Sequence, residues 1–190
     1  NAGGESYAIW AYFGQAATVS VPATFADKPV TVIGANAFAG NENFTAVALP
    51  AGLQRIAAGA FSNCLNLKQM SLPAGLAEIG ENAFSGCGLT SIVFDDRGGN
   101  DIILGDGCFA GNFSLSECIL PEGITALPSN MLAGDWERGS SLPAIRIPAS
   151  VESLGSLVFD YCNDTVIFFM GPPPTVGEDG MTSVPESLAN

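Results

Sequence analysis

A short stretch of sequence recurs every 23 residues in the first half of the chain, and a phenylalanine marks each copy. Phe38, Phe61 and Phe84 are each preceded by Ala, and each is followed by Ala or Ser and then by Gly or Asn. A period of about 20–50 residues predicts a solenoid, because one such unit can bury its apolar face only against its neighbours. We therefore expect a stack of similar coils around one continuous core.

The composition fits one buried core and argues against several classes of partner. The 190 residues are 47% hydrophobic and 13% charged, with a net charge of −13 and six basic residues. Nucleic acids and anionic membranes bind clustered Lys and Arg, and the basic residues here are scattered. No apolar run reaches the roughly 18–20 residues of a membrane helix, so we expect no membrane insertion. We interpret the start at Asn1 without a signal peptide as a trimmed or mature chain.

The repeat continues, with insertions, toward the end of the chain. The position that Phe38 occupies in the first unit, called the anchor position below, is later taken by Phe109, Leu132, Phe159 and Met181. Extra residues fall in 95–101 and 135–141, and insertions in solenoids usually emerge as loops on one face. We predict a single domain with an N-terminal cap at 1–29, a repeat array at 30–181 and a short tail at 182–190.

Each unit also contains one strand-like stretch. Its last two apolar residues are two positions apart, as in Val47 and Leu49 or Ile92 and Phe94, so both point inward from an extended strand. One strand per unit predicts a parallel sheet along one side of the coils. The segment around each anchor is predicted to close the other side as a short helical or 3₁₀ turn.

The full pattern, Ile-Gly-x-x-Ala-Phe-x-Gly/Asn-Cys-x-x-Leu-x-x-Val/Met/Ile-x-Leu-Pro, resembles the BspA-type leucine-rich repeat of bacterial surface proteins. The resemblance covers residues 30–181, and residues 7–10 and 19–22 look like the strand pair that caps such arrays. It implies a leucine-rich-repeat solenoid, an α/β-type right-handed coil with about six to seven coils. Leu132 and Met181 in place of Phe, and Asp95 in place of Pro, indicate irregular coils.

The resemblance also bears on function. Members of this family are typically exported, anchored on the cell surface and associated with adhesion to host or matrix proteins or to other bacteria. The family motif consists of structural residues, so it transfers no catalytic residue to this chain. It implies an extracellular or cell-surface location and a partner that is a protein or a glycan.

The position three residues after each anchor is the first candidate site. It holds Asn41, Cys64, Cys87, Asn112, Asp135 and Cys162. Cys and Asp are metal ligands, so a metal or redox ladder is one interpretation. The alternative is a turn cap whose side chain bonds backbone groups inside the solenoid, and the absence of His favours it.

The five cysteines, which include Cys108 and Cys118, occupy positions set by the repeat. We therefore expect buried free thiols and no disulfide framework. An acidic stretch from Asp95 to Asp106 offers oxygen ligands of the kind calcium prefers, but it lacks the spacing of an EF-hand loop. A solvated acidic loop is the alternative.

The outward positions of the strands form the third candidate site. They become more apolar along the chain, and the extended faces of solenoids often bind partners. The predicted binding face comprises Val93, Glu117, Ile119, Arg146, Ile167 and Phe169, with Trp136 as a contact in the neighbouring insertion. The alternative is that exposed β-branched residues simply suit strands, and that Trp136 folds back over the edge of the core.

Nothing in the sequence points to catalysis. The chain contains no His, which removes the Ser-His and Cys-His arrangements, and nothing brings two of its 19 acidic residues together. We expect a non-catalytic binding or adhesion module that is monomeric, without cofactor or metal, and does not bind nucleic acid. The alternatives are a structural spacer that presents another domain, and a carbohydrate-active enzyme.

Overall fold

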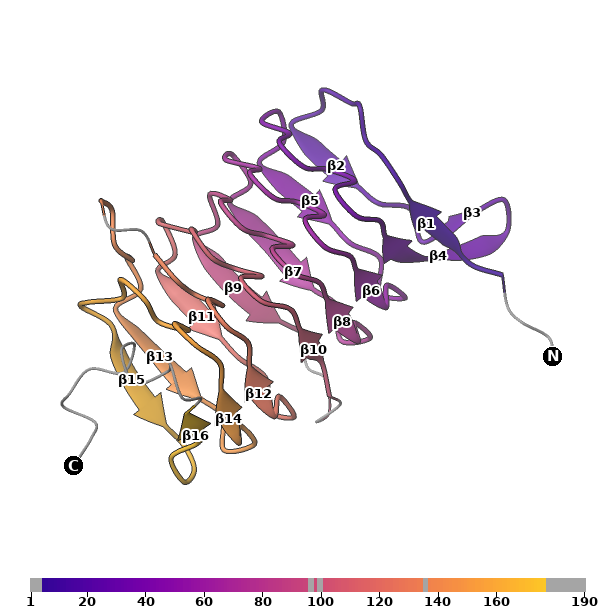
Figure 1. The fold of residues 1–190 in the computed structure, drawn as a ribbon. Helices are drawn as coiled ribbons and strands as arrows, with labels where there is room; N and C mark the ends of the chain where they lie inside the picture. Colours follow the sequence, from indigo (N-terminus) through magenta and orange to yellow (C-terminus); the bar gives the residue numbers. More distant parts are fainter. Residues whose placement is uncertain (1–4, 96–97, 99–100, 135–136, 177–190) are drawn as a thin grey trace.

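The strands of successive repeats lie side by side and form one long parallel sheet (Figure 1). The computed structural model describes residues 5–95, 98, 101–134 and 137–176. Neighbours in this seven-stranded sheet follow chain order. Its strands are β2 (Thr18–Ser20), β5 (Ala46–Ala48), β7 (Gln69–Leu72), β9 (Ser91–Phe94), β11 (Glu117–Ile119), β13 (Ala144–Ile147) and β15 (Val166–Phe169). The predicted solenoid of about six to seven coils with a parallel sheet is confirmed, and the structure has about seven.

A second row of short strands runs along the other side of the coils (Figure 1). One sheet contains β1 (Tyr7–Ile9), β4 (Lys28–Ile33), β6 (Arg55–Ile56), β8 (Glu78–Ile79) and β10 (Ile103–Leu104), and another contains β12 (Ala126–Leu127), β14 (Ser153–Leu154) and β16 (Thr175–Val176). β3 (Thr24–Phe25) pairs with β4 in the antiparallel direction. Most coils thus carry two strands where the sequence predicted one. The second was missed because two residues are too few to show alternation.

The segment around each anchor residue is a hydrogen-bonded turn, and no helix occurs in the described residues. The expected helical turn is wrong, because two residues of the turn have left-handed backbone conformations that a right-handed helix cannot contain. One lies two positions before the anchor in all six described turns, and in five of them a second lies two positions after it, with φ between 51° and 71°. They are Asn36, Gly59, Asn82, Gly107, Asn130 and Leu157 before it, and Gly40, Asn63, Gly86, Gly111 and Tyr161 after it.

Asn and Gly adopt this conformation at little cost, and their order along the solenoid has a steric reason. A Cβ atom on Gly59 would collide with Oδ1 of Asn36 in the preceding coil, and one on Gly107 would collide with Oδ1 of Asn82. An Asn in one coil therefore requires a Gly in the next. Leu157, in the last described turn, departs from this rule.

The anchor phenylalanines form a ladder of stacked rings through the core. Ring centroids are 4.8 Å apart for Phe38 and Phe61, 5.2 Å for Phe61 and Phe84, and 5.5 Å for Phe84 and Phe109, with interplanar angles of 11° or less. All four are buried. Tyr12 extends the ladder from the N-terminal segment, with its ring 5.2 Å from that of Phe38. Offset stacking stabilises such pairs by about 0.5–1.5 kcal/mol beyond the burial of their area.

The two N-terminal strands belong to different sheets. β1 pairs with β4, and β2 pairs with β5, both in parallel. They do not pair with each other. Each instead extends one of the two rows of strands beyond the first full repeat (Figure 1).

Phe61→Ala should lower the free energy of unfolding by about 3–5 kcal/mol, since it removes a buried ring that is stacked on both sides. Chemical denaturation followed by circular dichroism measures this. Phe13→Ala, at a ring that is 90% exposed, is the control and should change the free energy of unfolding by less than about 0.5 kcal/mol. A loss below about 1 kcal/mol for Phe61→Ala would contradict its structural role.

Leu157→Asn should raise the free energy of unfolding by up to about 1 kcal/mol, because Leu is strained at a φ of 56° and Asn is less so. The reverse exchange, Asn82→Leu, lies at the equivalent position of an earlier coil and should lower it by a similar amount. Urea titration of both variants gives the two values. Changes of the same sign would show that backbone conformation does not dominate at these positions.

Candidate functional site

The outward face of the seven-stranded sheet changes in character along the solenoid. On the first three strands its residues are small or polar: Thr18, Ser20, Ala46, Ala48, Gln69 and Ser71. From β9 onward the exposed residues include Val93, Ile119, Val166 and Phe168. Ile119 is 51% exposed and Phe168 is 50% exposed. The increase in apolar character predicted from the sequence is present on this face.

Two predicted face residues, Ile167 and Phe169, do not lie on it. Ile167 is buried and pairs with Ile145, and Phe169 packs, partly buried, against the core. The cause is one missing residue in this coil. The buried positions Leu142 and Ile145 are three residues apart, whereas Thr165 and Ile167 are only two apart.

Val166 and Phe168 are exposed in their place, paired with Ala144 and Arg146. A shift of one residue moves every side chain of a strand to its other face, so the sequence assignment of β15 was reversed throughout. The signal in the sequence was Thr165, which occupies the Leu position of the repeat. Its hydroxyl donates a hydrogen bond to the carbonyl of Leu142, at 2.6 Å.

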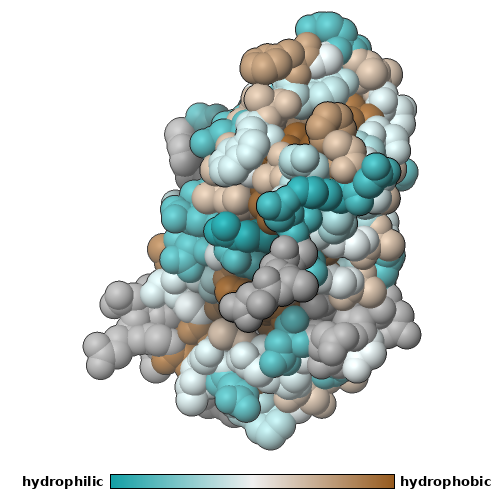
Figure 2. Space-filling view, turned by 90° about the vertical axis from the view of Figure 1, so that its right-hand side faces the viewer, coloured by the Kyte–Doolittle hydropathy of each residue, from teal (hydrophilic) through white to brown (hydrophobic). Residues whose placement is uncertain are grey.

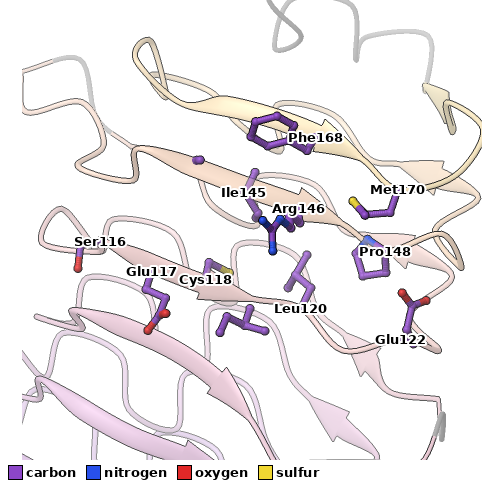
Figure 3. Close-up of a pocket in the computed structure, with 12 residues that line it drawn as sticks. Ser116, Glu117, Cys118, Leu120, Glu122, Ile145, Arg146, Pro148, Phe168 and Met170 are labelled. Atoms are coloured by element: carbon purple, nitrogen blue, oxygen red, sulfur yellow. The ribbon is translucent and has the colours of Figure 1, made fainter.

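The last three strands of the sheet form a groove of about 510 Å³ on this face (Figure 3). The lining residues come from β11, β13, β15 and the residues next to these strands: Ser116, Glu117, Cys118, Ile119, Leu120, Glu122, Ala144, Ile145, Arg146, Pro148, Phe168 and Met170. Three of the predicted face residues, Glu117, Ile119 and Arg146, are thus brought together, whereas Val93 lies on the adjacent strand β9.

Charge is placed unevenly in this groove. Arg146 lies near the centre of the lining residues, and Glu117 and Glu122 lie toward its sides (Figure 3). Arg146 is exposed and makes no ion pair with another described residue. Its guanidinium is therefore available to a partner, and its aliphatic stem adds to the apolar lining. The predicted contact Trp136 lies outside the described residues.

The position three residues after the anchor acts as a turn cap, which is one of the two interpretations of the sequence. The thiol of Cys64 donates to the carbonyl of Phe38 at 3.1 Å, and the thiol of Cys87 donates to that of Phe61 at 3.0 Å. Asn112 donates to the carbonyls of Phe84 and Phe109, at 2.9 and 2.8 Å. Each cap therefore satisfies the backbone carbonyl of the preceding anchor and links two coils. Asp135 lies outside the described residues.

The cysteines are free and buried, which confirms the expectation from their positions in the repeat. Burial raises the pKa of the Cys118 thiol to about 12. Burial also raises the pKa of the Cys108 thiol. The interaction between the thiols of Cys64 and Cys87 raises the pKa of Cys87, with burial adding to the effect, and lowers the pKa of Cys64. All five thiols are buried, and reactive cysteines lie in partially exposed surroundings, so we expect these thiols to be inert. In the described part of the chain, no three His, Cys, Asp or Glu residues come together as a metal site.

The carboxylates of Asp95 and Asp106, in the acidic stretch, accept hydrogen bonds from different residues. Asp95 accepts a hydrogen bond from the hydroxyl of Ser71 at 2.7 Å, and Asp106 accepts one from the backbone N–H of Ser129 at 3.0 Å. Asp96 and Asn100 lie outside the described residues. These two carboxylates thus bind groups of neighbouring coils.

None of the described segments forms a helix that is long and apolar enough to cross a bilayer.

Comparison with known proteins identifies the repeat. Six copies of the BspA type leucine rich repeat region match residues 31–166. No curated protein has a significantly similar sequence.

Several solved structures share the fold. A leucine-rich repeat protein from T. pallidum has a TM-score of 0.77 at 27% identity, over 94% of this chain and 83% of that one. A leucine-rich repeat protein from Bacteroides ovatus has a TM-score of 0.68 at 23% identity, over 84% and 47%. A leucine rich cell surface protein from Faecalibacterium prausnitzii has a TM-score of 0.62 at 24% identity, over 94% and 54%. The chain thus spans about half the length of the last two proteins.

All five thiols should resist alkylation in the folded protein, because each is buried. Incubation with iodoacetamide at pH 8, followed by intact-protein mass spectrometry, should show no adduct in the native state. The same treatment in guanidinium chloride should add five, one for each cysteine. Rapid labelling of the native protein would show that at least one of the five thiols is accessible and reactive.

Proposed function

The chain belongs to the BspA-type leucine-rich repeat family, and from this we propose that it is a non-catalytic recognition module that binds a protein partner at a cell surface or outside the cell. Solenoids of this kind present a broad, rigid face, and rigidity limits the conformational entropy lost on binding. The F. prausnitzii structure with the same fold is that of a cell surface protein, which supports the proposed location.

The groove over β11, β13 and β15 is the observation on which this proposal depends. It combines exposed apolar side chains, Ile119, Phe168 and Met170, with one exposed Arg at its centre. Energetically important contacts at protein interfaces are enriched in aromatic and Arg side chains at the centre of the contact area. The outward residues of β2, β5 and β7, on the other half of the same face, include no aromatic residue and no Arg.

The negative net charge of the chain indicates which class of protein it would bind. The chain has 19 acidic and six basic residues, and Glu117 and Glu122 lie at the groove. A field of this sign accelerates association with basic proteins. The proposed partner therefore offers an apolar patch with basic residues around it and a hydrogen-bond acceptor for Arg146.

A structural spacer is the second candidate function, because the chain spans about half the length of two of its structural neighbours. A spacer would bind nothing through the groove. Catalysis has no comparable support. A glycosidase needs two carboxyl groups that face one bond, one of them in a desolvated setting, and Glu117 and Glu122 are both exposed.

Ile119→Asp should weaken binding at least tenfold, equivalent to about 1.4 kcal/mol, since it places an unpaired carboxylate in an apolar contact. The partner is first captured on the immobilised chain from extracellular-matrix and mucin extracts, and the affinity is then measured with purified components. Ala48→Asp is the matched control, because Ala48 is an exposed outward residue of β5 on the same face. Equal affinities of both variants and the unmodified chain would rule out the groove, and failure to capture any partner would favour the spacer.

A further inference from the structure

A second hollow lies at the opposite end of the solenoid from the groove. It occupies about 440 Å³ between residues 12–15, which precede β2, and residues 39–43, the first anchor turn. The hollow is shallow and open to solvent, so a ligand would lie on it with much of its surface exposed. None of its lining residues is shared with the groove.

The wall formed by residues 12–15 is held in place by Tyr12. Its ring stacks on Phe38, and its backbone N–H donates to the carbonyl of Ala37 at 2.8 Å. The next residue, Phe13, is 90% exposed. Burying a Phe side chain stabilises a protein by about 1.5–3 kcal/mol, and the exposed ring of Phe13 does not contribute this stabilisation.

Seen from the N-terminal side, hydrophobic groups are scattered among hydrophilic ones, with no single large apolar area (Figure 2).

The opposite wall is polar. Asn41 accepts a hydrogen bond from the backbone N–H of Asn43 at 2.9 Å, and the backbone carbonyl of Glu42 accepts one from the Asn66 side chain at 2.8 Å. These bonds fix the backbone of the turn. The side chains of Gln15, Glu42 and Asn43 are exposed and make no hydrogen bond or ion pair with another described residue.

The residues four and five positions after the anchor vary from turn to turn. They are Glu42 and Asn43 in the first turn, Leu65 and Asn66 in the second, Gly88 and Leu89 in the third, and Asn163 and Asp164 in the turn of Phe159. The cap function explains Asn41, which donates weakly to the carbonyl of Gly14 at 3.4 Å. The cap function does not explain Glu42 and Asn43.

The chemistry of the lining selects among ligand classes. No Lys or Arg lines the hollow, so it has no counter-charge for an anion. Side-chain amides provide both donors and acceptors, which is what a hydroxyl group requires, and a carboxylate adds a strong acceptor. The face of an exposed aromatic ring offers an apolar, electron-rich surface on which the C–H groups of a sugar ring can pack.

We propose that this hollow is a binding site for a neutral saccharide, with the ring of Phe13 as the stacking surface and Gln15, Glu42 and Asn43 as hydrogen-bonding groups. The site goes beyond the proposed protein recognition, because it uses a different end of the molecule. A chain with both sites would hold a glycosylated surface at two points, and two linked contacts increase the overall affinity without new interactions.

The test uses the full chain and an array of oligosaccharides ending in galactose, glucose, mannose or N-acetylglucosamine, with sialylated and sulfated oligosaccharides alongside. Hits are titrated by saturation-transfer difference NMR. Binding of one or more neutral oligosaccharides is expected. Absence of neutral binders, or binding of the sialylated and sulfated compounds alone, would overturn the proposal.

Matched variants locate the site. Phe13→Ala should weaken saccharide binding at least tenfold, and Asn43→Ala should weaken it several-fold. Phe25→Ala is the control, since that ring is 64% exposed but does not line the hollow, and it should leave binding unchanged. Ile119→Asp should leave saccharide binding unchanged as well, which separates this site from the groove. Full binding by Phe13→Ala, or its loss in Ile119→Asp, would show that the saccharide binds elsewhere.

Discussion

Contact between the anchor rings of successive coils is the interaction on which this solenoid depends. Phe38, Phe61, Phe84 and Phe109 stack at centroid distances of 4.8–5.5 Å, which is close to the spacing of hydrogen-bonded strands (about 4.7–4.9 Å). The same spacing lets the backbone of each turn bond to the next, as Phe61 N–H does to the carbonyl of Ala83 at 2.8 Å. Side-chain stacking and backbone pairing therefore require the same geometry, and each reinforces the other.

The regular repeat leaves few residues for any other purpose, so departures from it mark the positions open to function. One departure is the shortened coil before β15, which turns Val166 and Phe168 outward and places Phe168 on the groove. Another is the segment of residues 12–15, which lies outside the repeat and exposes Phe13 beside the first anchor turn. The two lie at opposite ends of the array, where the pattern of the central coils imposes the weakest constraints.

Much of the fold could be predicted from residue spacing. The anchor positions, the caps and the buried thiols all follow from a period that assigns each residue type one environment. Turn conformation could not be read in this way, because Asn36 or Gly59 is compatible with a loop, a cap or a turn until its φ is known. The two-residue strands were missed for a similar reason, since β6 and β8 are too short to show a pattern.

The candidate binding face could be predicted from the sequence only in part. The sequence by itself determined that the outward residues become apolar toward the C-terminus, because alternation within each strand is a local property. Only the tertiary structure decided that Ile167 points inward and Phe168 outward, because the register of β15 is set by pairing with β13 across the sheet. The groove and the hollow also depend on the tertiary structure, since each is formed by residues that adjacent coils or the N-terminal segment bring together.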